Sequence, residues 1–225
     1  MGDRTSGRIG VLIAEDQDLL RTSLRELVDS DPGLVTAGEA RDGREAVAAA
    51  ARLLPEVVLM DIRMPVMDGL AATSAICERL PAAKVVVLTT FDLDEYVYEA
   101  LRAGASGFLL KNASPEDILR AIHTVHGGDA MLAPEVTGRV IAGYARERGR
   151  AWQGPSPFGA LTEREREVVG AIVQGMSNEE IAAELFLSRA TVKTYLSRLF
   201  LKLGVRDRTQ LVILAYESGF VEGRG

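Results

Sequence analysis

The sequence predicts two domains of different class: an α/β domain built on a parallel sheet, followed by a small all-α domain. In the first half of the chain, five short apolar runs alternate with five amphipathic stretches. Runs that are apolar at every position are typical of strands covered on both faces, and their alternation with helices indicates a parallel sheet. From residue 161 onward, every segment has its apolar residues at helical spacing instead.

The elements of the first half follow one another at short intervals. The expected strands are 9–14, 34–37, 57–60, 84–88 and 107–110. The expected helices are 19–28, 44–53, 70–80, 95–103 and 115–126. The last helix has the clearest start, because Ser114 can cap it, Pro115 suits its first turn and acidic residues follow.

The second half contains four predicted helices. Two of them open with a serine or threonine followed three residues later by a glutamate, the spacing of a capping box: Thr162 with Glu165, and Ser177 with Glu180. The second helix is expected over 178–186. Ser188 can cap a third helix over 189–203, which Gly204 ends, and a fourth is expected over 208–217.

These signals divide the chain into domains over 7–128 and 160–222, joined by a linker over 129–159. Residues 145–160 are rich in basic residues, glycine and proline, a composition typical of linkers. The pattern also allows a helix over 135–144 within the linker.

The composition excludes several classes of protein. Hydrophobic residues make up 47% of the 225 residues and charged residues 26%, so the chain can bury a core and is not a disordered protein. No run approaches the roughly 18 apolar residues of a membrane helix. The single cysteine, Cys77, cannot form an internal disulfide and fits a reducing compartment. Because the first ten residues also lack the apolar core of a signal peptide, we expect a cytoplasmic protein.

The charge is unevenly distributed along the chain. Residues 1–130 contain 13 lysines and arginines against 21 aspartates and glutamates, whereas residues 131–225 contain 13 against 11. Six of the basic residues fall within 188–208, where Asp207 is the one acid. An acidic first half and a basic stripe near the end predict two domains with different partners, the second of which binds nucleic acid.

Polar side chains follow four of the predicted strands, where those strands end. They are Glu15 and Asp16 after the first, Asp61 after the third, Thr89 after the fourth and Lys111 after the fifth. Ligands of open parallel sheets bind outside the carboxyl ends of the strands, so these groups should meet at one edge. Taken singly, an acid at a strand end could merely cap the next helix, but the shared position of all five favours a site.

This set of groups suits phosphoryl chemistry. Grouped carboxylates repel one another, and Mg²⁺, which takes one or two carboxylates together with water and phosphate, relieves that repulsion. A carboxylate beside the ion can attack a phosphoryl donor and become an aspartyl phosphate. A lysine and a threonine hydroxyl can then hold the phosphoryl oxygens.

Residues 9–126 resemble the receiver domain of two-component response regulators, through VVLMDIRMP over 57–65 and the Asp68–Gly69 pair behind it. The resemblance implies a flavodoxin-like (βα)5 fold and a sensor histidine kinase as partner. It implies that Asp61 is the phosphoacceptor, that Thr89 and Phe108 are switch residues and that Lys111 binds the phosphoryl group. It also implies a Mg²⁺ site made of Glu15, Asp16, Asp61 and the backbone carbonyl of Arg63.

The receiver motif departs from the family pattern at a few positions. Glu15 stands where aspartate is commoner, and Asn112 where many relatives have proline. Arg63 and Phe91 lie two residues after Asp61 and Thr89, positions that flank the path of an attacking water. We hypothesise that their bulk slows autodephosphorylation.

Residues 161–219 resemble the LuxR-type helix-turn-helix domain of the NarL/FixJ family, through LTxRE over 161–165, NEEIA over 178–182, TVK over 191–193 and KLGV over 202–205. The family places the helix 189–203 in the major groove of DNA. The buried stripe of this helix is expected to be Val192, Leu196, Leu199 and Leu203.

The opposite face of that helix is the expected DNA surface. The residues expected to reach base edges are Lys193, Thr194 and Ser197. Those expected to contact phosphates are Thr191, Tyr195, Arg198 and Lys202, with Tyr195 standing where many relatives carry histidine. A unit of about 60 residues contacts few bases, so we expect a two-fold dimer on two half-sites.

Together the two resemblances predict a transcriptional response regulator. Phosphorylation of Asp61 would promote dimerisation, release of the DNA-binding domain, or both, and the dimer would bind operator DNA, with RNA polymerase as a further partner. One alternative is that a ligand or protein partner, not phosphate, sets the state of the receiver.

A second alternative is a phosphohydrolase that works through an aspartyl phosphate. Such enzymes commonly carry a second aspartate two residues after the nucleophile as a general acid, and Arg63 occupies that position here. We therefore expect no enzymatic activity beyond the receiver's own phosphoryl transfer and autodephosphorylation.

Overall fold

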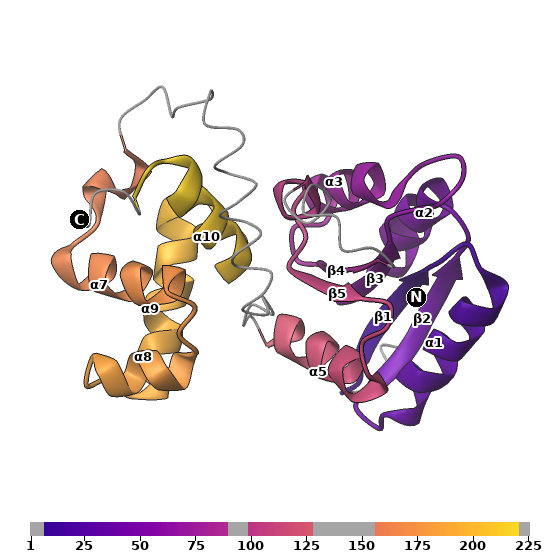
Figure 1. Ribbon diagram of the computed structural model, residues 1–225, viewed down its shortest axis with the longest axis horizontal. Helices are drawn as coiled ribbons and strands as arrows, with labels where there is room; N and C mark the ends of the chain where they lie inside the picture. The colour runs from indigo at the N-terminus through magenta and orange to yellow at the C-terminus, as the bar shows by residue number, and fades with distance from the viewer. Residues whose placement is uncertain (1–6, 90–98, 128–155, 221–225) are drawn as a thin grey trace. The chain divides into compact units, whose positions relative to one another are not determined.

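A computed structural model describes residues 7–89, 99–127 and 156–220 (Figure 1). The chain divides into two compact units, of which one contains the sheet and the other the C-terminal helices. The predicted linker falls almost wholly outside the described residues, as do the helix expected over 135–144, the start of the helix expected over 95–103, and Phe91.

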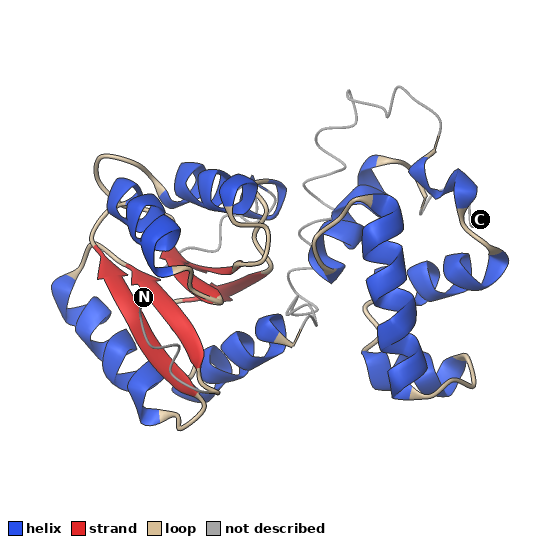
Figure 2. Ribbon diagram, turned by 180° about the vertical axis from the view of Figure 1, so that it is seen from behind, coloured by secondary structure: helices blue, strands red, loops and turns tan. Residues whose placement is uncertain are grey.

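The sheet of the first unit is parallel throughout, as predicted. Its strands are β1 (Ile9–Ala14), β2 (Leu34–Ala40), β3 (Val57–Asp61), β4 (Lys84–Thr89) and β5 (Gly107–Leu110). Within the described residues the order is β2-β1-β3-β4-β5. Figure 2 shows this sheet in red with helices beside it. The direction of strand succession reverses at β1 and β3, and the crevice at such a reversal is where ligands bind in open α/β sheets.

The strands end at the same level of the sheet. Ala14 pairs with Met60, Met60 with Val87, and Val87 with Phe108. This register brings the residues that follow β1 and β5 to the same edge as the last residues of β3 and β4. Strand β2 continues three residues past its predicted end, because on the edge of the sheet it carries half-exposed and polar positions that the search for apolar runs left out.

Helices cover both faces of the sheet. They are α1 (Asp18–Ser30), α2 (Gly43–Leu53), α3 (Gly69–Arg79) and α5 (Pro115–His126), and residues 99–102 are also helical. Helix α1 packs beside α5 on one face and α2 beside α3 on the other (Figure 1). Fully buried Val11, Val57 and Val86 pack toward α1 and α5. Their neighbours Leu12 and Val58, on the opposite face, are also fully buried, and burial on both faces accounts for the strands' unbroken apolar sequence.

The second unit is helical, as predicted. It contains a short 3₁₀ helix, η1 (Pro157–Ala160), followed by α7 (Glu163–Val173), α8 (Asn178–Glu184), α9 (Arg189–Leu203) and α10 (Arg208–Glu217). Both capping boxes form, at Thr162 and Ser177. Gly204 ends α9 in the left-handed conformation.

Helix α8 is shorter than predicted. It ends at Glu184, whereas the sequence pattern extends it to residue 186. Phe186 adopts a left-handed backbone with φ of 53°, which a right-handed helix cannot include, and the chain turns there into α9. The apolar periodicity of 178–186 predicted a longer helix because Phe186 continues it, yet this side chain is 95% exposed.

The helices of the described residues are too short or too polar for any of them to cross a lipid bilayer.

Candidate functional site

The predicted acidic groups meet at the carboxyl edge of the sheet. Glu15 follows β1, and its backbone N–H donates to the carbonyl of Ala40 at 3.0 Å, which extends the pairing of β1 with β2. Asp61 is the last residue of β3. Lys111 follows β5 and donates its backbone N–H to the carbonyl of Thr89 at 2.7 Å. The sheet pairing therefore continues into the site and fixes the backbone that carries these side chains.

Three carboxylates and one ammonium form the centre of the site. Glu15, Asp16 and Asp61 offer carboxylate oxygens that all lie within 4.8 Å of one another. The Nζ of Lys111 lies 2.7 Å from Oε2 of Glu15 and 2.9 Å from Oδ2 of Asp61. Glu15 and Asp61 are buried, with exposed fractions of 0% and 4%, whereas Asp16 is exposed. One buried ammonium thus lies between two buried carboxylates, with a third at the surface.

Burial and pairing shift the pKa values of Glu15 and Lys111. Burial raises the pKa of Glu15, and Asp61 raises it further, while the hydrogen bond from Lys111 opposes both. Burial by itself would lower the pKa of Lys111, but its bonds to Glu15 and Asp61 outweigh that cost and raise it. Lys111 therefore stays charged, and the cluster retains an excess of negative charge.

This excess negative charge fits a divalent cation. Lys111 can neutralise one carboxylate of the three, and carboxylate oxygens are the ligands that hard cations prefer. The exposure of Asp16 leaves one side of the cluster open to solvent. The site therefore suits Mg²⁺, which keeps several waters and takes few protein ligands.

The loop after β3 is held tightly against the end of that strand. The N–H of Gly69 donates to the carbonyl of Ile62 at 2.8 Å. A Cβ atom at Gly69 would lie 1.9 Å from the carbonyl oxygen of Asp61, so no other residue fits without moving that backbone. Asp68 caps α3 by accepting from the N–H of Ala71. The Asp68–Gly69 pair thus fixes the loop that contains Arg63.

The predicted switch residues share one face of the sheet. Thr89 is 5% exposed and Phe108 is 3% exposed. Phe108 pairs with Val87, two residues before Thr89, so the side chains of Phe108 and Thr89 project on the same side. The aromatic ring is buried in this structure.

Arg21 is a part of the site that sequence reasoning missed. It is 5% exposed, and its Nη1 donates to the backbone carbonyl of Glu15 at 2.8 Å. The signal was present in the sequence, because Arg21 lies on the buried face of α1 with Leu24 and Val28. A cation in an apolar stripe needs partners, and such a cation points to a polar network.

Helices α8 and α9 form the predicted helix-turn-helix, and residues 185–188 connect them, with the turn at 185–186 and not at the predicted Leu187 and Ser188. Val192, Leu196 and Leu199 are buried, as expected of the inner stripe of α9, whereas Leu203 is only half-buried. Five of the predicted DNA-contact residues of α9 are exposed: Lys193, Thr194, Ser197, Arg198 and Lys202. The other two, Thr191 and Tyr195, are half-buried.

Several of these side chains have partners within the chain. The hydroxyls of Thr194 and Ser197 donate to the carbonyls four residues earlier, at 3.0 Å each, and keep their acceptor lone pairs. The hydroxyl of Thr191 lies 2.8 Å from that of Ser188, the cap of α9. The Nζ of Lys202 lies 2.8 Å from Oε2 of Glu165, an ion pair that its sequence motif did not predict.

Two arginines hold the first helix of this motif in place. Arg208 is 7% exposed, and it donates to Oδ1 of Asn178 at 3.3 Å and to the carbonyl of Met176. Arg164 donates to the carbonyl of Leu185 at the opposite end of α8. Both ends of α8 are therefore tied to neighbouring helices by guanidinium groups, a role that no helical periodicity reveals.

Comparison with known proteins finds a different family match for each of the two parts of the chain. Residues 11–123 match the response regulator receiver domain, and residues 159–215 match the luxR family of bacterial regulatory proteins. The transcriptional regulatory protein LnrK of Bacillus subtilis is 41% identical over 94% of this chain and 98% of its own. The transcriptional regulatory protein LiaR of the same organism is 38% identical over 95% and 99%.

A solved structure aligns with nearly the whole chain. The response regulator ChrA of a heme-sensing two-component system is 35% identical, covers 93% of this chain and 96% of its own, and has a TM-score of 0.51. The first family match covers the sheet, the second covers most of the C-terminal helices, and the relatives align over nearly their whole length. The chain therefore belongs to the two-component response regulators that join a receiver domain to a LuxR-type DNA-binding domain, and it is a transcriptional regulator.

Proposed function

We propose that a sensor histidine kinase switches this regulator by phosphorylating Asp61. The observation that carries the proposal is the position of the Asp61 carboxylate, 2.9 Å from Lys111 and within 4.8 Å of the carboxylates of Glu15 and Asp16. We assign the receiver to residues 7–128, the linker to 129–159 and the DNA-binding domain to 160–222.

The chemistry is the transfer of one phosphoryl group. A carboxylate oxygen of Asp61 attacks the phosphorus of a phosphohistidine, the P–N bond breaks as the P–O bond forms, and the electron pair returns to the imidazole. Before the transfer, the ammonium of Lys111 pairs with the carboxylate of Asp61. After the transfer, the same ammonium holds the negatively charged phosphoryl oxygens. Bound Mg²⁺ would neutralise the remaining phosphoryl charge, held by Glu15, Asp16, Asp61 and the backbone carbonyl of Arg63.

The switch acts through Thr89 and Phe108. A phosphoryl group on Asp61 adds acceptor oxygens, toward which the Thr89 hydroxyl moves to donate. Because Phe108 lies on the same face of the sheet, this movement changes the packing around its ring. The altered surface favours a receiver dimer, releases the DNA-binding domain, or does both.

The released domain places α9 in the major groove of operator DNA. We assign base contacts to exposed Lys193, Thr194 and Ser197. We assign phosphate contacts to a second group: Thr191, Tyr195, Arg198 and Lys202. Two copies bind two half-sites, and RNA polymerase is the further partner at the promoter.

Intact mass tests the phosphorylation directly. Full-length protein is incubated with acetyl phosphate, with and without Mg²⁺, beside Asp61→Asn and Asp16→Asn. We expect a gain of one phosphoryl group that needs Mg²⁺, is absent in Asp61→Asn and is slowed in Asp16→Asn. If the gain persists in Asp61→Asn, the assignment of Asp61 is wrong.

The DNA contacts and the dimer are tested with the same preparations. Selection of bound duplexes from a randomised pool identifies the preferred sequence, and sedimentation velocity gives the mass of the protein before and after phosphorylation. We expect the phosphorylated form to sediment as a dimer and to select a sequence with two-fold symmetry. A phosphorylated monomer that selects a single half-site would contradict the proposed dimer.

A further inference from the structure

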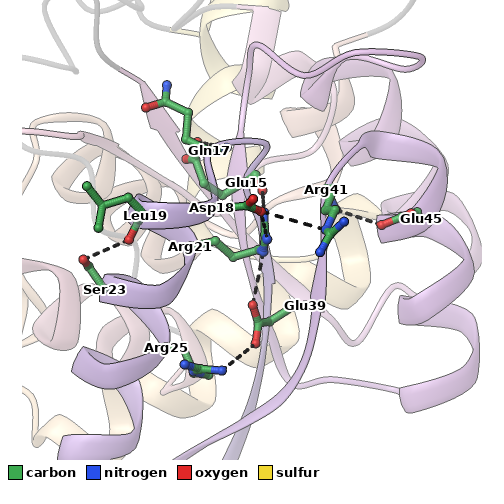
Figure 3. A network of polar contacts seen from close by, with 10 residues as sticks. All are labelled: Glu15, Gln17, Asp18, Leu19, Arg21, Ser23, Arg25, Glu39, Arg41 and Glu45. Atoms are coloured by element: carbon green, nitrogen blue, oxygen red, sulfur yellow. Dashed lines mark hydrogen bonds and ion pairs between the residues drawn. The ribbon is translucent and has the colours of Figure 1, made fainter.

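A buried arginine lies beneath the acidic turn of the receiver. Arg21 projects from α1, and its side chain is 6% exposed (Figure 3). Its guanidinium contacts three different parts of the fold. Nη1 donates to the carbonyl of Glu15 at 2.8 Å, Nε to Oε2 of Glu39 at 3.1 Å, and Nη2 to the carboxylate of Asp18. The residue therefore connects the end of β1, the strand β2 and the start of α1.

The guanidinium acts here as a rigid template. Its donors have fixed directions in one plane, so three acceptors bound at once are held relative to one another. Its charge is balanced by Asp18 and Glu39, whose carboxylates it pairs with. The influence of Arg21 on the acidic site is therefore exerted through its hydrogen bond to the Glu15 carbonyl.

That carbonyl belongs to the peptide group that joins Glu15 to Asp16. Holding it fixes the orientation of the peptide plane, and with it the directions in which both side chains leave the backbone. The Asp16 side chain is exposed, unlike that of Glu15, so packing constrains it less. Its place beside Asp61 therefore depends on the backbone of this turn.

The same turn lacks the support that the starts of α2, α3 and α5 have. Side chains cap α2, α3 and α5 at Asp42, Asp68 and Ser114. Gln17, the N-cap of α1, makes no side-chain cap hydrogen bond. The backbone N–H of Gln17 is bound by Oε1 of Glu15 at 3.2 Å, so the acidic residue itself is part of the turn. At the start of α1, the hydrogen bond from Arg21 to the Glu15 carbonyl fixes the backbone, as a capping side chain does at the starts of α2, α3 and α5.

We propose that Arg21 is a positioning residue for the divalent-cation site, which it holds in binding geometry through the Glu15 carbonyl. The inference rests on the proposed function, since it concerns the cation that Glu15, Asp16 and Asp61 bind. Residues that orient metal ligands through hydrogen bonds commonly contribute 10- to 100-fold to affinity, roughly the effect expected here.

The test is a Mn²⁺ titration of the full-length protein, with free Mn²⁺ measured by electron paramagnetic resonance. The variants are Arg21→Gln and Arg21→Lys, and the matched control is Arg25→Gln. Arg25 lies one turn further along α1 and pairs with the same Glu39, at 3.4 Å, but its side chain is 43% exposed. We expect Arg21→Gln to weaken Mn²⁺ binding by roughly 10-fold or more, Arg21→Lys to weaken it less, and Arg25→Gln to leave it unchanged.

Thermal unfolding separates positioning from a merely structural role. A cation that binds the folded protein raises its melting temperature by an amount set by its affinity. We expect added Mn²⁺ to raise the Tm of wild type and of Arg25→Gln, and to raise the Tm of the Arg21 variants less. If Arg21→Gln and Arg21→Lys melt lower but bind Mn²⁺ as tightly as wild type, the proposal is overturned. Arg21→Lys keeps the buried charge and serves if Arg21→Gln does not fold.

The outcomes also separate this inference from the proposed function. If wild type binds no Mn²⁺, the cation site itself is wrong and both fall. If wild type binds Mn²⁺ and the Arg21 variants bind it equally, the inference fails alone, and phosphorylation of Asp61 stands.

Discussion

The two functional surfaces of this regulator hold their charges in opposite ways. In the receiver, the side chains of Glu15 and Lys111 are buried and pair with each other. On α9, Lys193 and Arg198 are exposed to solvent. The receiver site is part of the core of its domain. The DNA surface is the exposed face of α9, a helix that is stabilised by the packing of its buried face.

This difference has a physical consequence for substitutions. A buried charge loses its hydration and must be compensated by neighbours, so removing one partner leaves the other uncompensated. An exposed charge keeps its hydration and contributes little to folding. Changes in the receiver site should therefore alter stability and function together, whereas changes on α9 should alter DNA binding alone.

The largest expected effect follows from removing the buried ammonium. Lys111→Met leaves the carboxylates of Glu15 and Asp61 without their shared partner. We expect the free energy of unfolding at pH 7, measured in urea with EDTA, to fall by about 3 kcal/mol. Part of this loss should return near pH 5, because Glu15, whose pKa burial raises, takes up a proton as the pH falls and then needs no partner.

The matched control is Lys193→Met, the same substitution at an exposed position of α9. We expect its free energy of unfolding to lie within about 0.5 kcal/mol of wild type at both pH values. Equal losses in the two variants would show that burial does not govern the difference between the surfaces.

The sequence predicted the residues of the receiver site, but it did not predict the buried arginines that hold the backbone in place. Asp61 and Lys111 were found because apolar runs locate strands, and the ends of parallel strands meet at one edge. Arg21 and Arg208 were missed because each binds groups that are far from it in the sequence, such as Glu39 and Asn178. Helical periodicity indicates which face of a helix is buried, but it does not identify the hydrogen-bond partners of a buried arginine.

The sequence also predicted the exposed face of α9, for the same reason. Val192, Leu196 and Leu199 mark the inner stripe at helical spacing, and the opposite face follows from it. It did not predict that Phe186 would end α8, since a left-handed residue in a turn leaves no periodic signal. Nor did it predict the ion pair of Lys202, whose partner Glu165 lies 37 positions away.

The next largest effect concerns DNA recognition. Lys193→Ala should cost about 1–3 kcal/mol at the selected sequence and relax the preference at one base pair, because the ammonium reads a base edge. Arg198→Ala should weaken binding to all sequences alike and reduce the salt dependence by about one contact. Fluorescence anisotropy against salt concentration measures both. If Lys193→Ala weakens all sequences equally, Lys193 contacts phosphate and not a base.

A smaller effect should appear when Lys202 is freed from its partner. Glu165→Gln keeps the capping box, which accepts glutamine, but removes the charge 2.8 Å from the Nζ of Lys202. If Lys202 contacts phosphate, it no longer has to leave an ion pair to do so. We expect tighter binding to all duplexes, by a few-fold at most, since such exposed pairs contribute less than about 1 kcal/mol. Unchanged or weaker binding would remove Lys202 from the DNA surface.

The smallest effect tests whether burial, rather than membership of the receiver, decides the cost of losing a charge. Asp31 and His123 pair at 2.9 Å between Nε2 and Oδ2, in the receiver but near solvent, with the His123 side chain 45% exposed. The hydrogen bond from His123 lowers the pKa of Asp31 below its ordinary 3.8. A lowered carboxyl pKa stabilises the fold above that ordinary value, and the contribution is lost as the pH falls through the lowered pKa.

His123→Ala should therefore lower the free energy of unfolding at about pH 5 by less than about 1 kcal/mol, and the difference from wild type should shrink toward pH 3. Urea unfolding of both proteins at the two pH values measures it. A loss as large as that of Lys111→Met would mean that any ion pair of the receiver supports its fold strongly. A small loss that disappears in acid would leave desolvation as the reason why the site around Lys111, and not the rest of the receiver, combines stability with function.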